Sequence, residues 1–265
     1  MRPDPTFNAG ASAYDLVTGR WSRAFGATLL AAARVGSGQT VLEVSAGTGG
    51  LAAEAAAQVG ASGRVIVTDL ALPMLREAQG KIAGLPVRAV AMDGQALACR
   101  AESVDVVLCQ LGLMFFPDAA RGLREFRRVL RPDGRLAVQV WSVPERVHYL
   151  GMLADALRPY FADQRDDLYA PTRLADPARL HPLLAGAGFR DVSVVAATQE
   201  IAFDSFDEYW SGIEAGGGRL AQFYVLLPAD ARRAVRAEVS ARMAPLESAG
   251  RLILSAEALI GIGRA

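Results

Sequence analysis

The sequence predicts an α/β fold in which a mostly parallel sheet carries helices on both faces. Short runs rich in β-branched residues alternate with helix-forming runs between residues 40 and 141, which is the pattern of successive strand–helix–strand units. An acidic residue stands at or just after the end of each of the first three strand-like runs. Because right-handed crossovers leave the carboxyl ends of parallel strands at one edge, we expect a ligand site there.

Composition narrows the class of protein. The 265 residues are 52% hydrophobic and 21% charged, which suits one large domain with a helical addition. The formal net charge is zero, so we expect no nucleic-acid partner. Cys99 and Cys109 form no metal or disulfide framework. The N-terminus lacks the apolar core of a signal peptide, and no apolar run reaches the ~18 residues that a membrane span needs. We expect a cytoplasmic protein without a metal and leave its oligomeric state open.

The first strand-like run, residues 41–44, leads directly into a small-residue loop and then an Ala-rich helical run, residues 51–59. A strand, a glycine-rich turn and a helix in this order can cradle a nucleotide, because glycine admits close backbone approach and the helix offers free N–H groups. Gly47 and Gly49 do not complete the G-x-G-x-x-G spacing of a dinucleotide site. Glu43 precedes these glycines, where a carboxylate could meet a cationic amino group.

Further acidic residues follow the next strand-like runs of the sequence. Residues 64–68 predict a second strand followed by Asp69, which could accept hydrogen bonds from both hydroxyls of a ribose. Residues 87–92 predict a third strand that ends in Asp93 and Gly94. A fourth strand, residues 104–108, precedes the phrase Leu-Met-Phe-Phe-Pro-Asp at 113–118. Residues 126–136, which contain Val-Leu-Arg-Pro-Asp-Gly-Arg-Leu, predict a helix, a turn and a fifth strand.

Taken in order, these motifs resemble those of class I S-adenosylmethionine-dependent methyltransferases. The phrases at 113–118 and 129–136 are similar to the branch that includes the ubiquinone and menaquinone C-methyltransferases. The matching region spans roughly residues 37 to 141. The resemblance implies a Rossmann-like, doubly wound sheet of seven strands, mostly parallel with an antiparallel last strand, and S-adenosyl-L-methionine as the cofactor.

The remaining segments predict a lid and a helical cap around one domain. We divide the chain into an N-terminal lid segment (1–36), with 1–13 flexible and 14–35 helical, and a methyltransferase domain (37–265). Helical insertions are expected at about 142–187 and 205–246, with helices over 144–161, 176–187 and 230–243. A sixth strand is expected over 189–197 and a closing strand over 251–263.

The resemblance also implies roles at the cofactor. Glu43, Gly47 and Gly49 would hold the methionine moiety, Asp69 the ribose, and Met92 and Asp93 the adenine edge. Gln110 and Leu111 would lie near the sulfonium, and Arg20 would pair with the cofactor carboxylate. The complete set of expected cofactor residues is Tyr14, Arg20, Trp21, Glu43, Ser45, Gly47, Gly49, Asp69, Leu70, Met74, Met92, Asp93, Gly94, Gln110 and Leu111.

Some of these residues could instead have a purely structural role. Asp69 could cap a helix, Asp93 could serve an ordinary Asp-Gly turn, and the N-terminal helix could be merely amphipathic. Many family members carry glycine where this chain has Ser45. A serine can make this turn if its φ is negative, and its hydroxyl can then satisfy a loop amide, so we expect Ser45 to be tolerated there.

The acceptor pocket is expected where residues 14–21, 113–116 and 148–152 converge over the sheet edge. His148 is the candidate proton acceptor, with a surface or capping histidine as the alternative. The expected pocket residues are Leu113, Phe115, Phe116, Tyr149 and Met152.

This pocket predicts methyl transfer to a small-molecule acceptor that is aromatic, quinone-like or polyketide, and neutral and flat rather than highly charged. A cyclase or rearrangement enzyme that keeps the cofactor fold is the alternative. A nucleic-acid methyltransferase is disfavoured because the Asn/Asp-Pro-Pro-Tyr/Phe phrase is absent after the fourth strand. The acceptor atom stays open.

Overall fold

A computed structural model describes residues 7 and 10–265, so the flexibility expected of residues 1–13 falls largely outside the described residues. The strands form one mixed sheet in the order β3-β2-β1-β4-β5-β8-β6. Their bounds are β1 Thr40–Val44, β2 Arg64–Asp69, β3 Val87–Ala91, β4 Val104–Gln110, β5 Leu130–Trp141, β6 Arg190–Phe203, β7 Glu247–Ser248 and β8 Arg251–Arg264. Strands β1 to β5 are parallel, whereas β8 runs antiparallel between β5 and β6. The predicted fold class is therefore confirmed.

One small strand was not expected. The two-residue β7 pairs with the start of β8, because Ala249 and Gly250 both adopt positive φ, at 50° and 76°. Two consecutive residues in the left-handed region make the tight turn that joins antiparallel strands. The sheet therefore has eight strands in place of seven.

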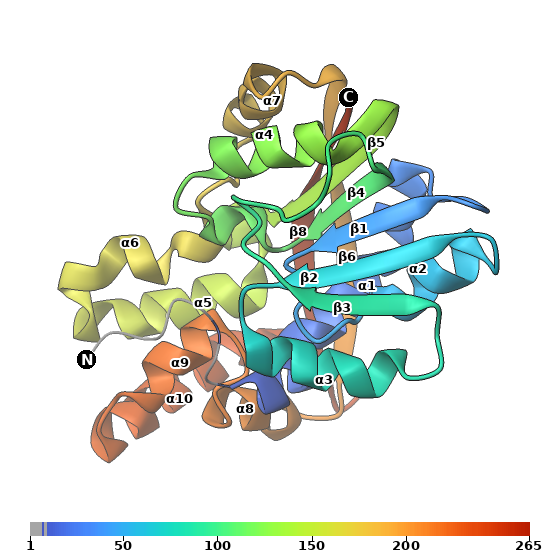
Figure 1. Ribbon diagram of the computed structural model, residues 1–265. Coiled ribbons are helices and arrows are strands. Elements are labelled where there is room, and N and C mark those ends of the chain that lie inside the picture. Colours follow the sequence, from blue (N-terminus) through green and yellow to red (C-terminus); the bar gives the residue numbers. More distant parts are fainter. Residues whose placement is uncertain (1–6, 8–9) are drawn as a thin grey trace.

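Helices pack against both faces of the sheet (Figure 1). The helices α1 (Thr18–Ala33) and α2 (Ala52–Val59) cover one face, with α3 (Leu72–Ile82) beside α2. The helices α4 (Ala119–Val129) and α7 (Pro177–Gly186) cover the other face. The central strands β1 and β4 are buried on both sides, which explains why their sequences are continuous apolar runs and do not alternate.

The N-terminal helix is shorter than its sequence pattern predicts. A 3₁₀ helix, η1 (Ala11–Leu16), precedes α1, and the two are separated at Val17. The break turns Asp15 toward the glycine loop, where its carboxylate accepts a hydrogen bond from the Thr48 hydroxyl at 2.9 Å and pairs with Lys81 of α3. A tertiary contact therefore overrides the local helical pattern.

The remaining helices form a cap. They are α5 (His148–Leu157), α6 (Arg165–Leu168), α8 (Phe206–Glu214), α9 (Arg219–Val225) and α10 (Ala229–Met243). In Figure 1 they lie together at one end of the molecule. In α10, which agrees with the helix expected over 230–243, the apolar residues Val235, Val239 and Met243 are buried, because residues four positions apart lie on one face of a helix. No helix among residues 10–265 is long and apolar enough to cross a membrane.

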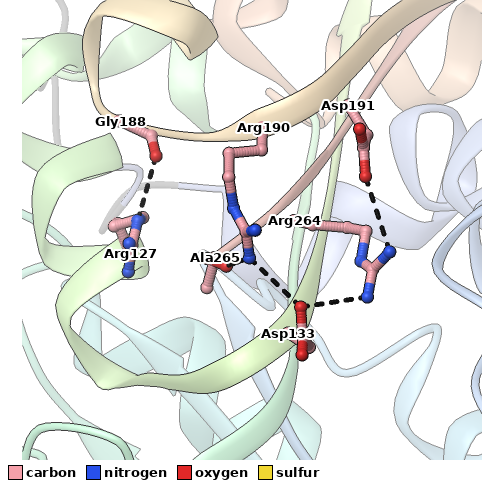
Figure 2. A network of polar contacts seen from close by, with 7 residues as sticks. All are labelled: Arg127, Asp133, Gly188, Arg190, Asp191, Arg264 and Ala265. Carbon is pink, nitrogen blue, oxygen red and sulfur yellow. Dashed lines mark hydrogen bonds and ion pairs between the residues drawn. The ribbon is translucent and has the colours of Figure 1, made fainter.

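The Pro-Asp-Gly turn that carries part of the family resemblance has a structural role (Figure 2). Asp133 accepts hydrogen bonds from Arg190 at 3.1 Å and from Arg264 at 3.0 Å, and Arg190 also donates to the carbonyl of Ala265 at 2.6 Å. These residues join the start of β5, the start of β6 and the end of β8. The network therefore lies at the opposite sheet edge from the acids that follow β1, β2 and β3.

Candidate functional site

A cavity lies over the carboxyl ends of β1, β2 and β4, beneath η1 and the cap. Its walls come from the loops after these strands, from η1 and α1, and from α5 and α9. The three segments in which we expected the acceptor pocket all contribute to it. The predicted site residues that line this cavity are Tyr14, Ser45, Gly47, Asp69, Leu70, Met74, Met92, Asp93, Gly94, Gln110, Leu111, Phe115, Phe116 and Tyr149.

Glu43 stands at the base of the site with its carboxylate almost fully buried. It is 2% exposed, and its Oε2 atom has no hydrogen-bond partner among the described residues. Burial, with a smaller contribution from the charge of Asp69, raises the pKa of Glu43 from its ordinary value of 4.5 to about 8. It lines a small recess together with Tyr14, Ser45 and Gln110, which also line the cavity. A buried carboxylate oxygen without a partner suits a cationic amino group.

The glycine loop follows β1 directly. Gly47 and Gly49 have φ of 56° and 73°, and a Cβ on Gly49 would lie 3.0 Å from the Cβ of Ala78 in α3. Glycine therefore provides both the backbone conformation and the close packing at position 49.

Ser45 does not meet the condition of a negative φ, because its φ is +59°. The N–H of Ala46 still donates to Thr68 in β2, at 2.9 Å, so the chain must turn within one residue of the end of β1. The loop after β4 also packs against this turn, since a Cβ on Gly112 would lie 2.4 Å from that of Ser45. Serine thus occupies a conformation that favours glycine.

Asp69 links the second strand to the glycine loop. Its Oδ2 accepts the N–H of Gly47 at 2.8 Å, and its Oδ1 accepts the N–H of Ala71, just before α3, at 2.9 Å. Burial raises its pKa even though these backbone hydrogen bonds lower it. Asp69 therefore holds the start of a helix, which agrees with the alternative in which it caps a helix. It also lines the cavity.

Asp93 and Gly94 form a tight turn that supports an aromatic ring. The Oδ1 atom of Asp93 accepts the N–H of Gln95 at 2.8 Å. A Cβ on Gly94 would lie 2.4 Å from Phe116, and one on Gly122 would lie 2.5 Å from the same ring. The ring of Phe116 is therefore wedged between two glycines at the cavity wall.

Gln110 ties the lid helix to the sheet. Its Nε2 donates to the carbonyl of Ser22 at 2.9 Å and to Oε1 of Gln139 at 3.1 Å. Burial raises the pKa of Tyr14, which lies over the same recess, to about 12. The phenol stays protonated near neutral pH and can act only as a hydrogen-bond donor or acceptor.

Seven predicted site residues do not line the cavity itself: Glu43, which lies in the adjoining recess, His148 and Met152, which lie in another pocket, and Arg20, Trp21, Gly49 and Leu113. Arg20 donates instead to Glu208 at 2.7 Å and to the carbonyl of Ala202 at 3.0 Å, with its guanidinium 4.0 Å from the Phe203 ring centre. Trp21 is fully buried and stacks on Tyr149 with ring centres 5.3 Å apart, so it backs the wall and does not face the ligand. Gly49 packs on α3. Leu113 is buried in the core.

The structure also separates His148 and Met152 from Tyr149. His148 and Met152 line a different, polar pocket with Asp155 and Tyr169, and Nδ1 of His148 accepts the N–H of Ser255 at 3.5 Å. The reason is helix geometry. Positions four apart share a face of α5, whereas adjacent positions point about 100° apart. The expected proton acceptor therefore does not reach the cavity.

Several lining residues were missed by sequence reasoning. Trp141 ends β5 at the same sheet edge and could have been inferred from that position. Arg219 and Pro171 come from the cap, where no motif marks them, whereas Leu150 lies within the expected segment 148–152 but was not singled out. The remaining missed residues are Phe7, Thr18, Gln95, Gly112, Met114 and Pro117. Among the described residues, no three His, Cys, Asp or Glu side chains form a group that could hold a metal.

Comparison with known proteins agrees with this geometry. Residues 41–134 match the model of a methyltransferase domain. The ubiquinone/menaquinone biosynthesis C-methyltransferase UbiE of Klebsiella pneumoniae is 31% identical over 180 residues, covering 62% of this chain and 71% of the relative. The chain belongs to the class I S-adenosylmethionine-dependent methyltransferase family. The resemblance expected from the motifs is thus confirmed.

Other similarities extend beyond UbiE. An uncharacterized protein of Mycobacterium tuberculosis is 35% identical over 54% of this chain, which spans about half (51%) of that relative. Phosphoethanolamine N-methyltransferase 2 of Haemonchus contortus, solved with S-adenosyl-L-methionine, has a TM-score of 0.60 at 17% identity, covering 97% of this chain and 57% of that one. The [4+2]-cyclase SpnF has a TM-score of 0.56 at 16% identity, covering 92% and 82%. At these identities the two structures show the fold alone.

The residues present fit the cofactor of the family, S-adenosylmethionine. The Glu43 carboxylate oxygen that has no hydrogen-bond partner within the described part of the chain suits its amino group, and the backbone of the glycine loop leaves room for a close approach. Asp69 and Asp93, at the ends of neighbouring strands, face the cavity where the nucleoside would lie.

Proposed function

We propose that this protein transfers the methyl group of S-adenosylmethionine to a small-molecule acceptor held beneath the cap. The observation that carries the proposal is a single cavity whose lining has two chemically different parts. The polar part of the lining includes Asp69 and Asp93, at and after the ends of β2 and β3, while the aromatic part includes Phe115 in the segment after β4, Trp141 at the end of β5 and Tyr149 in α5. A site that holds a polar nucleoside beside an apolar acceptor needs both parts.

Each cofactor-side residue has a distinct role in this proposal. Glu43 binds the amino group, Asp69 the ribose hydroxyls, and Asp93 with Met92 the adenine edge. When bound, S-adenosylmethionine supplies a methyl group on a sulfonium; transfer breaks the S–C bond, forms a bond to the acceptor and leaves S-adenosylhomocysteine.

The chain itself would contribute orientation and exclusion of water. Holding two reactants in attack geometry can account for ~7–11 kcal/mol of a barrier. Trp21, Trp141 and Tyr149 form a packed aromatic group, with Trp141 and Tyr149 ring centres 5.7 Å apart. Burial raises the pKa of Tyr149 well above its ordinary value, so neither Tyr149 nor Tyr14 serves as a base near neutral pH.

The aromatic residues that line the cavity and the name of the UbiE relative together support a class of acceptor. An aromatic wall suits a flat ring, and the name of the relative describes C-methylation in ubiquinone and menaquinone biosynthesis. We therefore propose an aromatic or quinone-like acceptor, with a polyketide as the next candidate.

Calorimetry and turnover test the proposal. S-adenosylmethionine and S-adenosylhomocysteine should bind with micromolar affinity, and NAD should give no comparable heat. Incubation with S-adenosylmethionine and a panel of hydroxylated aromatics should release S-adenosylhomocysteine, detected by mass spectrometry. If neither cofactor form produces heat at millimolar concentration, the proposal is wrong.

A second candidate is a cyclase or rearrangement enzyme that keeps the cofactor without using its methyl group. The fold shared with the [4+2]-cyclase SpnF supports it, as does the position of His148 outside the cavity. Conversion of an acceptor without release of S-adenosylhomocysteine would favour this candidate over methyl transfer.

A further inference from the structure

We propose that the hydroxyl group of Tyr149 donates a hydrogen bond to an oxygen atom of the acceptor, which makes Tyr149 a specificity-determining residue of the methyl-transfer site. The inference rests on the proposed function and narrows its substrate class. Among aromatic and quinone-like acceptors, it favours those that present a carbonyl oxygen to the aromatic part of the cavity lining.

The first observation is that the phenol of Tyr149 lacks a hydrogen bond. Tyr149 lines the cavity and is 3% exposed, and its hydroxyl oxygen has no partner among residues 7 and 10–265. Other buried side-chain atoms of these residues also lack a partner, but Tyr149 is the one residue among them that lines the main cavity. A buried hydroxyl without a partner lowers stability, and a ligand that supplies the partner explains why it is there.

The second observation is a contrast with two tyrosines that do not line this cavity. Tyr169 donates to the carboxylate of Asp155 at 2.8 Å. Tyr209, which is fully buried, donates to the backbone carbonyl of Tyr149 at 3.4 Å. The cap therefore supplies partners to these two phenols, and the unpaired phenol is the one at the cavity.

The third observation is that neighbouring aromatic residues hold the ring of Tyr149 in place. The ring stacks on Trp21, with ring centres 5.3 Å apart and planes 10° apart. Trp141 meets it edge to face, with ring centres 5.7 Å apart and planes 81° apart. A ring held in this way loses little side-chain entropy when a ligand binds, so its hydroxyl can select one ligand atom.

The protonation state of Tyr149 decides which kind of ligand atom suits it. Burial raises the pKa of Tyr149 well above its ordinary value, with smaller contributions from Tyr14 and Tyr209. The phenol therefore keeps its proton near neutral pH and can donate it in a hydrogen bond. A carbonyl oxygen accepts such a bond and has no proton of its own that would stay unpaired in an apolar site.

The position of Tyr149 in the fold favours the acceptor over the cofactor as the source of this oxygen. Tyr149 lies in α5, which follows β5, and packs against Trp141 at the end of β5. The acids assigned to the cofactor lie instead in or just after β1, β2 and β3. The aromatic part of the lining is also where the proposed function places the acceptor.

Ketones and their parent hydrocarbons test the proposal on protein saturated with S-adenosylhomocysteine. Calorimetry compares 1-tetralone with tetralin and 1-indanone with indane, in the wild type and in Tyr149→Phe. The substitution should weaken binding of at least one ketone by ~5-fold or more and leave its parent hydrocarbon within ~2-fold, as loss of one buried hydrogen bond implies. Comparing the change across the two proteins cancels the difference in hydration between ketone and hydrocarbon.

Tyr209→Phe is the matched control, because it removes a buried phenol hydroxyl that does not line the cavity. It should leave the ratio of ketone to hydrocarbon affinity as in the wild type. The proposal is overturned if Tyr149→Phe leaves that ratio unchanged, or if the wild type binds neither ketone at millimolar concentration.

Urea unfolding of the empty protein gives an independent readout. Tyr149→Phe should raise the urea midpoint, because it removes a buried hydroxyl that has no partner. Tyr209→Phe should lower the midpoint, because it removes a hydrogen bond. A lower midpoint for Tyr149→Phe would mean that the protein itself satisfies the hydroxyl, which would also overturn the proposal.

The cofactor is the competing partner of Tyr149, and its binding is measured separately. Tyr149→Phe should change the affinity for S-adenosylhomocysteine by no more than ~2-fold, because the acceptor carries the oxygen. Weaker binding of S-adenosylhomocysteine with unchanged ketone binding would assign the phenol to the cofactor and overturn the proposal. Absence of any cofactor binding by the wild type is a different result, because it would refute the proposed function itself.

Discussion

A 2.8 Å hydrogen bond joins the carboxylate of Asp69 to the N–H of Gly47. The acid at the end of β2 and the glycine loop after β1 therefore form one unit. A ligand that binds the Asp69 carboxylate therefore contacts the same group that fixes the shape of the glycine loop.

Asp69→Ala should weaken binding of S-adenosylhomocysteine by ~1.5–3 kcal/mol, the range for a lost hydrogen bond to a charged group. Asp69→Asn should not be a mild change. Both carboxylate oxygens accept backbone N–H groups, from Gly47 and Ala71, and an amide would place a donor against one of them. Calorimetry on variants that unfold cooperatively measures both effects. Wild-type affinity in either variant would mean that Asp69 only supports the backbone.

Cofactor affinity should depend on pH through Glu43. The pKa of about 8 in the empty site means that most Glu43 is protonated at pH 7, whereas a cationic amino group needs the ionised carboxylate. Binding should therefore release close to one proton near pH 7, and affinity should rise between pH 6 and 8. Calorimetry in buffers with different ionisation enthalpies measures the released protons. Glu43→Gln should bind weakly and release none; proton release equal to that of the wild type would contradict the assignment.

Glu43 should also set a pH dependence of stability in the empty protein. Its pKa is raised from 4.5 to about 8 on folding, so the folded state holds the proton that the unfolded state has lost. The stabilisation is complete below about pH 4.5 and is lost as pH rises toward and through about 8. In urea unfolding, Glu43→Gln should show a flatter decline over pH 5–8 than the wild type. An identical decline in both would mean that Glu43 is not the group responsible.

Gly94→Ala should disturb both the fold and the cofactor site. The new Cβ would lie 2.4 Å from Phe116 and 2.8 Å from Val44, and overpacking of this kind costs ~1–3 kcal/mol. Displacement of Phe116 should also weaken binding of S-adenosylhomocysteine several-fold. Gly80→Ala is the control, because nothing lies within 4 Å of its Cβ in α3 and the change should stabilise the helix by ~0.5–1 kcal/mol. Equal unfolding free energies for the two variants would argue against the packing described.

Ser45→Gly should leave the protein equally or more stable. The φ of +59° costs serine roughly 1–2 kcal/mol, while glycine loses roughly 0.5–1 kcal/mol more on folding. Ser45→Ala keeps the strain and should bring no gain. Urea unfolding of the three proteins decides the matter. A clear loss of stability in Ser45→Gly alone would indicate that the serine hydroxyl has a role that offsets the strain.

The sequence alone determined the sheet and the acids at its edge. Strands β1 to β5 are encoded by local apolar runs, and connection rules bring their carboxyl ends together, so Glu43, Asp69 and Asp93 could be predicted to share a site. The antiparallel β8 followed from the family resemblance.

Only the tertiary structure decided which side chains face the ligand. Arg20 and Arg219 are both arginines near helix starts, yet Arg20 pairs with Glu208 and Arg219 lines the cavity. His148 and Tyr149 are adjacent in sequence, yet they line different pockets because neighbouring side chains of α5 point about 100° apart. These outcomes depend on how distant helices pack against one another, and local propensity and spacing carry no information about that packing.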